Sequence, residues 1–237
     1  MRLLLLSNSR NPGGEYLGHV RDELREFLGP VREVFFVPFA GVSIGWAEYA
    51  ARVRQALEPL GVSVRSAGEV DDPLAAARSA EAFMVGGGNT FQLLRMMYST
   101  GLRAVFQERV RAGTPYLGWS AGSNLACPTI RTTNDMPVVE PPSLDALGLV
   151  PFQINPHYTD RVLDNHGGET RDERIAEFLT LNPGVTVLGL REGSWLRVEG
   201  ASIQLKGPHP AKRFLAGAQA VELHPGDINT GLGDFNG

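Results

Sequence analysis

The chain of 237 residues is 43% hydrophobic and carries a formal net charge of −4 at pH 7. Because no Gly/Ser-rich or charged linker divides it, we expect one domain over residues 1–225 and a flexible tail over 226–237. The negative charge gives no electrostatic reason to expect a nucleic-acid partner. No segment approaches the roughly 20 apolar residues of a membrane helix, so no membrane partner is expected either.

The N-terminus and the cysteine content bear on location. The apolar run 3–6 is too short for a signal-peptide core and predicts a buried first strand. Cys127 is the only cysteine, which excludes an internal disulfide and fits a cytoplasmic protein. A homodimer is compatible with the sequence, which does not itself define the oligomeric state.

Short apolar runs alternate with helical patterns along the chain. The first half predicts a strand at 3–6, a helix at 15–27, a strand at 34–37, a helix at 46–57, a strand at 62–65, a helix at 73–79, a strand at 82–85 and helices at 90–98 and 102–111. The second half predicts a strand at 115–119, a short helix that ends before Pro128, a strand at 152–155, a helix at 170–181, a strand at 185–190 and a hairpin of 195–198 with 202–205. This alternation predicts an α/β fold with a mostly parallel open sheet and helices on both faces, which binds ligands beyond the carboxyl ends of its strands.

The segment Gly118-Trp119-Ser120-Ala121-Gly122 matches the pattern G-x-S-x-G between an expected strand and an expected helix. A sharp turn in this context lifts the serine oxygen clear of the sheet, and the glycines leave room beside it. Ser120 is therefore the candidate nucleophile of a serine hydrolase. The alternative is an ordinary strand-to-helix turn.

A serine hydroxyl needs a base to become a good nucleophile. The chain has five histidines: His19, His157, His166, His209 and His224. His157 directly follows the strand 152–155, which places it at the same sheet edge as Ser120, and His166 is the second choice. The alternative for His157 is a hydrogen-bonded structural histidine.

The base in turn needs a carboxylate that fixes its tautomer and orientation. Glu192 follows the strand 185–190 and is the candidate, with Asp135 and Asp160 as rivals. The alternative for Glu192 is a solvated carboxylate at the end of a strand.

Gly86-Gly87-Gly88-Asn89 follows the strand 82–85 and opens a helix. The unhindered backbone N–H groups of this turn, together with the N–H of Ala121, could face a developing oxyanion. The alternative is a tight turn without a ligand. Asn89 is a further candidate for substrate binding. The glycine turn and the three triad candidates each follow a different expected strand, so a parallel sheet would gather them at one edge.

Seven stretches of the chain resemble the peptidase E family, the α-aspartyl dipeptidases. They are LLLLSNS (3–9), VPFAGV (37–42), VGGGNTFQLL (85–94), GWSAGSNLACPTIRTTNDMP (118–137), QINPHYT (153–159), GETRDERI (168–175) and GLREGSW (189–195). The resemblance extends from the N-terminus to about residue 207, and it is far more specific than the nucleophile pattern alone.

The resemblance implies a fold like the class I glutamine amidotransferase domain, with a serine in place of its cysteine. It implies removal of an N-terminal aspartate from dipeptides and short peptides, without a cofactor or metal. The triad would be Ser120, His157 and Glu192, with an oxyanion hole at Gly88 and Ala121. The amidotransferases carry their acid two residues after the histidine, where this chain has Thr159.

Specificity for aspartate requires a fixed cation near the side chain of the first substrate residue. Arg171 is the candidate, because its place at the start of the helix 170–181 adds the helix dipole to its charge. The alternative function of Arg171 is a solvated pair with Glu169 or Asp172, and Arg131 is the rival selector. Asp135, Asp160 and Glu169 remain open as partners of the substrate α-amine.

Two other functions compete with this interpretation. One is a different hydrolase on the same scaffold, either an esterase or a cyanophycin-type exopeptidase, which would share the triad but not the aspartate pocket. The other is a non-catalytic ligand-binding α/β module, which predicts a broken triad. No metal-ligand spacing such as H-E-x-x-H is found in the sequence.

Overall fold

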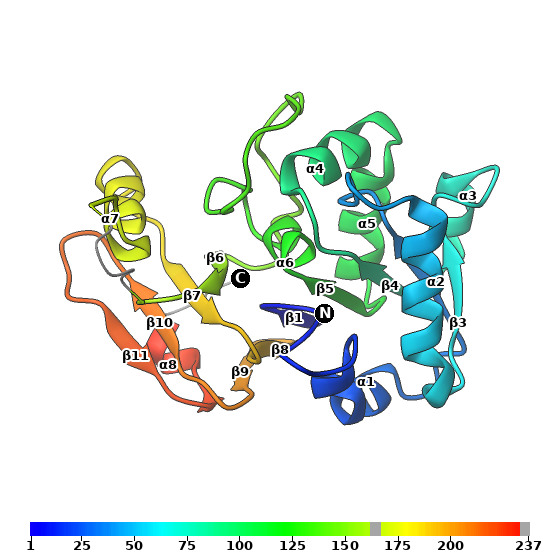
Figure 1. Cartoon of the computed structure of the whole chain (residues 1–237), viewed down its shortest axis with the longest axis horizontal. Helices are drawn as coiled ribbons and strands as arrows, with labels where there is room; N and C mark the ends of the chain where they lie inside the picture. The colour runs from blue at the N-terminus through cyan, green and yellow to red at the C-terminus, as the bar shows by residue number, and fades with distance from the viewer. Residues whose placement is uncertain (162–166, 233–237) are drawn as a thin grey trace.

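A computed structural model describes residues 1–161 and 167–232 of the chain (Figure 1). Its larger sheet has eight strands in the order β12-β9-β8-β1-β5-β4-β2-β3. Five neighbouring strands of this sheet pair in parallel: β1 (Arg2–Leu6), β5 (Tyr116–Trp119), β4 (Ala82–Val85), β2 (Glu33–Val37) and β3 (Ser63–Ser66). The antiparallel side holds β8 (Trp195–Glu199), β9 (Ser202–Lys206) and β12 (Gly226–Asp227).

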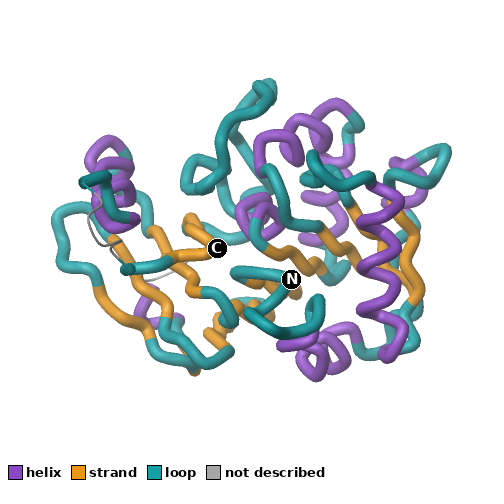
Figure 2. The backbone as a smooth tube through the Cα atoms, in the orientation of Figure 1, coloured by secondary structure: helices purple, strands orange, loops and turns teal. Residues whose placement is uncertain are grey.

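Helices cover both faces of this sheet, as Figure 2 shows. Successive side chains of a strand point to opposite faces, so the four consecutive leucines of β1 contribute to two cores. Leu4 and Leu6 pack with α1 (Arg21–Leu28) and α2 (Trp46–Leu57). Leu3 and Leu5 belong to the core on the other face, which includes residues of α3 (Pro73–Arg78), α4 (Thr90–Ser99), α5 (Leu102–Arg111) and α6 (Ala121–Ala126). The expected α/β fold with a mostly parallel sheet is confirmed.

A second sheet of four strands lies beside the first, at the left of Figure 1. Its order is β11-β10-β7-β6, with β6 (Gln153–Tyr158), β7 (Val187–Arg191), β10 (Ala211–Phe214) and β11 (Val221–Leu223). The helix α7 (Arg171–Leu181) packs on it through Ile175 and Leu179, which share a small core with Tyr158, Val187 and Phe214. Residues 152–155 and 185–190, expected in one parallel sheet with the others, therefore contribute strands to this separate sheet.

Two further segments differ from the sequence expectations. The helix expected at 15–27 begins only at Arg21, after a 3-10 turn at Gly18–Val20. Leu17 has φ 55°, a left-handed backbone conformation that ends any helix started at residue 15. In the expected flexible tail, β12 pairs with β9, and α8 (Asn229–Leu232) follows with Ile228 and Leu232 buried in the core. These two apolar side chains attach residues 226–232 to the sheet despite the polar composition around them.

No helix among the described residues is long and apolar enough to cross a membrane.

Candidate active site

Ser120 occupies the sharp turn between β5 and α6. Its backbone has φ 53° and ψ −112°, a conformation that non-glycine residues rarely adopt. A Cβ atom on Gly118 would lie 2.5 Å from the carbonyl of Gly122, and one on Gly122 would lie 2.3 Å from the carbonyl oxygen of Val85. The two glycines of the pattern are therefore required by close packing around the turn, which exposes the serine hydroxyl at the end of β5.

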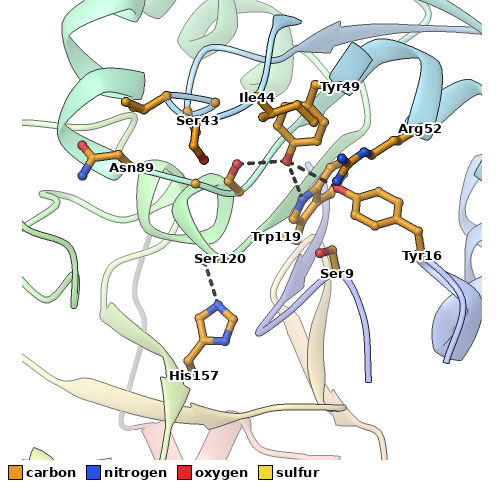
Figure 3. Close-up of a pocket in the computed structure, with 15 residues that line it drawn as sticks. Ser9, Tyr16, Ser43, Ile44, Tyr49, Arg52, Asn89, Trp119, Ser120 and His157 are labelled. Atoms are coloured by element: carbon orange, nitrogen blue, oxygen red, sulfur yellow. Dashed lines mark hydrogen bonds between the residues drawn. The ribbon is translucent and has the colours of Figure 1, made fainter. Parts of the chain in front are cut away.

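His157 approaches Ser120 from the second sheet. It lies within β6, where the pairing with β7 shifts between Pro156 and Tyr158, and its φ is 53°. This local irregularity turns the imidazole toward the nucleophile, and Nε2 lies 2.9 Å from the Oγ of Ser120 (Figure 3). Among the histidines in the described part of the chain, only His157 is hydrogen-bonded to Ser120; the second choice, His166, lies outside the described residues.

Glu192 directly follows β7 and completes the chain of hydrogen bonds. Its Oε1 lies 2.6 Å from Nδ1 of His157. The two rival carboxylates have other partners: Asp160 accepts from Arg191 at 3.0 Å, and Asp135 accepts from the backbone N–H of Thr90 at 2.7 Å. The hydrogen bond from Arg191 lowers the pKa of Asp160 below its ordinary value, so this carboxylate stays ionised against its arginine. Of the three candidates, Glu192 is the one that contacts the imidazole.

Two side chains in the loop after β1 hold His157 and Glu192 in place. The Ser7 hydroxyl accepts from the backbone N–H of His157 at 2.9 Å and donates to the carbonyl of Leu190 at 2.7 Å. The Asn8 side chain accepts from the N–H of Gly193 at 2.8 Å. Neither residue was predicted as part of the site from the sequence. The polar pair that ends the apolar strand β1, at the same sheet edge as the nucleophile, was the available signal.

The backbone N–H groups of Gly88 and Ala121, both at the turns beside Ser120, lack an acceptor among the described residues, as do those of their neighbours Gly87 and Gly122. The N–H groups on either side of the Gly87–Gly88 pair are occupied, since Gly86 donates to Val37 at 3.1 Å and Asn89 donates to Ala40 at 2.8 Å. Free N–H groups at a nucleophilic turn can stabilise a developing oxyanion.

The side chain of Asn89 has partners of its own. Its amide oxygen accepts from the N–H of Gln92 at 3.0 Å, which caps α4, and its amide nitrogen donates to the carbonyl of Met136 at 2.8 Å. These bonds anchor the loop that follows α6 to the start of α4. Asn89 also lines the cavity that Ser120 and His157 share, so its role in substrate binding stays a prediction.

Ser120 and His157 open into a cavity of about 500 Å³. Its remaining walls come from the loop after β1, the loop between β2 and α2, α2 itself and the glycine turn; they include Ser9, Tyr16, Ile44, Tyr49, Arg52 and Gly88 (Figure 3). A cavity that combines apolar and polar walls beside a nucleophile can hold one small organic substrate.

Arg171 lines a second cavity of about 230 Å³, which contains both arginines proposed as selectors. Arg131, Arg171 and Arg174 line it together with Asp135 and with Asn155, which precedes His157 by two residues. No side chain among the described residues forms a hydrogen bond or ion pair with the Arg171 guanidinium. Burial, followed by repulsion from Arg174, lowers the pKa of Arg171, as expected for a cation without an anionic partner.

The three candidate partners of the substrate α-amine differ in what they contact. Asp160 is bound to Arg191, and Glu169 lies 3.7 Å from Arg174. Asp135 lines the same cavity as Arg171. Among the described residues, no group of three or more His, Cys, Asp or Glu side chains is arranged to hold a metal ion.

Comparison with known proteins places this geometry in a family. The profile of peptidase family S51 matches residues 3–206. Peptidase E of Salmonella typhimurium strain LT2 is 50% identical over 226 residues, and peptidase E of Citrobacter koseri is 51% identical; each alignment covers 95% of this chain and 99% of the relative. The solved structure of a protein assigned to peptidase E in Listeria monocytogenes EGD-e is 24% identical, with a TM-score of 0.63, and the match covers 87% of this chain and 98% of that one.

Proposed function

The chain belongs to peptidase family S51 and is a serine-type dipeptidase, and we propose that it hydrolyses the bond after an N-terminal aspartate in dipeptides and short peptides. One observation supports the proposal most directly: the hydrogen-bonded series Ser120, His157, Glu192, with separations of 2.9 and 2.6 Å. These are the parts that a serine hydrolase needs, in the order in which it uses them.

In the proposed reaction, Ser120 attacks the carbonyl carbon of the aspartyl residue. With Nδ1 of His157 protonated toward Glu192, Nε2 accepts the serine proton and later delivers it to the leaving amine. Water then attacks the acyl-enzyme, His157 again removes the proton, and free aspartate departs. Glu192 stabilises the imidazolium in both halves of the cycle.

We propose that the N–H groups of Gly88 and Ala121 bind the oxyanion that forms in each tetrahedral intermediate. Support comes from their lack of an acceptor among the described residues and from their places: Ala121 directly follows Ser120, and Gly88 lines the same cavity as Ser120. Donors fixed before the reaction need no reorganisation as the charge develops.

We propose that Arg171 selects aspartate. Its guanidinium lines a cavity next to the strand of His157 and has no anionic partner among the described residues. The carboxylate of a substrate aspartate would supply that partner. Its position at the first residue of α7 adds the partial positive charge of the helix start. Arg131, in the same cavity, is the alternative selector.

Two further assignments follow from the cavities. We propose that Asp135 binds the substrate α-amine, since it lines the smaller cavity with Arg171, whereas Asp160 is paired with Arg191 and Glu169 with Arg174. We propose that the larger cavity takes the leaving residue, because Ser120 and His157 both line it. A cytoplasmic location is proposed from the single cysteine, which is buried and reduced.

The test is a substrate panel. We expect the purified protein to hydrolyse Asp-Leu and to act at least 100-fold more slowly on Asn-Leu, Glu-Leu and Leu-Leu, since these lack a carboxylate at the required reach. Ser120→Ala, prepared in parallel, controls for contaminating peptidases. Preferred hydrolysis of Leu-Leu, or of an ester without aspartate, would support the competing hydrolase instead; the family match does not favour that alternative or a non-catalytic module.

A further inference from the structure

The three glycines after β4 are approached closely from two sides. A Cβ atom on Gly86 would lie 2.5 Å from the hydroxyl oxygen of Tyr49. A Cβ atom on Gly87 would lie 3.0 Å from the Cβ of Ser120. The turn is therefore packed between Tyr49 of α2 and the nucleophile, and Gly86 is required so that the Tyr49 hydroxyl can reach the backbone.

The hydroxyl of Tyr49 has three neighbours within hydrogen-bond distance. The indole Nε1 of Trp119 donates to it at 3.1 Å, and the Tyr16 hydroxyl donates to it at 3.3 Å (Figure 3). The carbonyl oxygen of Gly87 lies 2.9 Å away. An indole N–H only donates and a carbonyl only accepts, so the Tyr49 proton goes to Gly87. Burial raises the pKa of Tyr49 above its ordinary value, which keeps this proton on the phenol.

The carbonyl of Gly87 and the N–H of Gly88 belong to the same peptide group. In a trans peptide these two groups point in opposite directions across a rigid plane. Fixing the carbonyl toward Tyr49 therefore fixes the direction of the Gly88 N–H, which has no acceptor among the described residues, beside the cavity that Ser120 lines.

We propose that Tyr49 is a positioning residue for the oxyanion hole, and that its hydroxyl orients the Gly88 N–H through the Gly87 carbonyl. The inference rests on the proposed function, since it assumes that Ser120 forms a tetrahedral oxyanion there. Trp119 strengthens the link, because the residue that donates to Tyr49 directly precedes the nucleophile. One buried hydroxyl thus connects the glycine turn to the serine turn.

Tyr49→Phe removes the hydroxyl and keeps the ring packing. We expect kcat for Asp-Leu to fall about 10-fold with KM within twofold of wild type, since the donor stays but is less well directed; outright loss of a donor costs about 10²–10³. The matched control is Tyr98→Phe, which likewise removes a hydroxyl that donates to a backbone carbonyl, that of Asp145 at 3.0 Å; Tyr98 does not line the cavity of Ser120, and the change should leave kcat within twofold.

A second measurement separates orientation from general loosening. The aldehyde analogue of aspartate adds reversibly to Ser120: the Oγ–carbon bond forms, the serine proton passes to His157, and the carbonyl electron pair becomes the oxyanion. We expect its affinity to fall in Tyr49→Phe by the same factor as kcat, with the pH profile of kcat/KM unchanged and the affinity for aspartate within twofold.

Three outcomes would overturn the proposal: a kcat for Tyr49→Phe within twofold of wild type, an equal loss in Tyr98→Phe, or a loss of kcat without a matching loss of aldehyde affinity. Hydrolysis of Asp-Leu by the wild type and its absence in Ser120→Ala are measured first. Failure of the proposed function is thereby distinguished from failure of the role given to Tyr49.

Discussion

The nucleophile side of the site, formed by β4, β5, their following turns and Ser120, differs from the base side, formed by β6, β7, His157 and Glu192. On the nucleophile side, Trp119 and Tyr49 are 1% and 6% exposed, and the hydroxyl of Tyr49 links the indole of Trp119 to the carbonyl of Gly87. On the base side, the side chains of His157 and Glu192 are 38% and 50% exposed. The serine and the candidate oxyanion donors are thus fixed by a buried core, whereas the base and the acid are held by a few hydrogen bonds from the loop after β1.

Removing the nucleophile is expected to have the largest effect on activity. We expect Ser120→Ala to lower kcat for Asp-Leu by about 10⁶ while the protein remains folded, since no other group can form the acyl-enzyme. Steady-state rates and circular dichroism measure both parts. More than a few per cent of wild-type activity in a preparation free of other peptidases would contradict the assignment of Ser120.

Removing the acid tests the base side alone. We expect Glu192→Ala to lower kcat by about 10⁴, because the imidazole loses the partner that fixes its tautomer and stabilises its charge. Asp135→Ala is the comparison variant: Asp135 does not contact His157, and because it is the proposed partner of the substrate α-amine, its loss should raise KM more than it lowers kcat. If Asp135→Ala lowered kcat more than Glu192→Ala, with both variants folded, the acid would be misassigned.

The nucleophile side could be predicted from the sequence because residues close together in the chain determine its structure. The turn at Ser120 follows from a short pattern, and the glycines that the pattern requires are the ones the packing requires. The position of His157 could be predicted only to the nearest strand end. Its φ of 53° depends on pairing with β7 and on the hydrogen bond that its N–H donates to the hydroxyl of Ser7, 150 residues away in the sequence.

The division into two sheets could not be predicted for the same reason. Alternating strands and helices indicate an α/β fold but not which strands pair, since pairing is decided by contacts between distant segments. β6 belongs to the smaller sheet, but it is tied to the larger one through α6. The Asn124 side chain of α6 donates to the carbonyl of Ile154 in β6 at 2.7 Å, which keeps the two sheets adjacent. His157 and Glu192 therefore reach Ser120 across a boundary between sheets that the sequence pattern does not reveal.

The helix of the second sheet carries the proposed selector, so specificity should be separable from the chemistry of Ser120. We expect Arg171→Met to lower the ratio of kcat/KM for Asp-Leu over Asn-Leu about 100-fold, because an unpaired substrate carboxylate costs about 3 kcal/mol. Lysine at this position should rescue only in part, since it lacks the planar fork of arginine. An unchanged ratio would exclude Arg171 and make Arg131→Met the next variant.

Ser7, which directly follows β1 of the larger sheet, forms hydrogen bonds to both strands of the base side. The residue is fully buried, and its hydroxyl joins the N–H of His157 to the carbonyl of Leu190. The positive φ of His157 is a conformation that persists only when surrounding groups hold it. The hydroxyl is therefore expected to maintain the alignment of the imidazole between Ser120 and Glu192.

We expect Ser7→Ala to lower kcat about 10-fold, the smallest of these effects, because every reacting group remains and only its alignment is lost. The unpaired N–H and carbonyl should also cost about 1–3 kcal/mol each, which lowers Tm by several degrees in a chain of this size. Ser194→Ala is the matched control: its buried hydroxyl donates to the carbonyl of His209 at 2.9 Å on the same side of the molecule and does not contact β6. A similar fall in Tm with kcat within twofold of wild type is expected for Ser194→Ala. If both serine variants lost stability equally and both kept wild-type kcat, the hydrogen bond from Ser7 would serve folding alone, and the base side would be as firmly fixed as the nucleophile side.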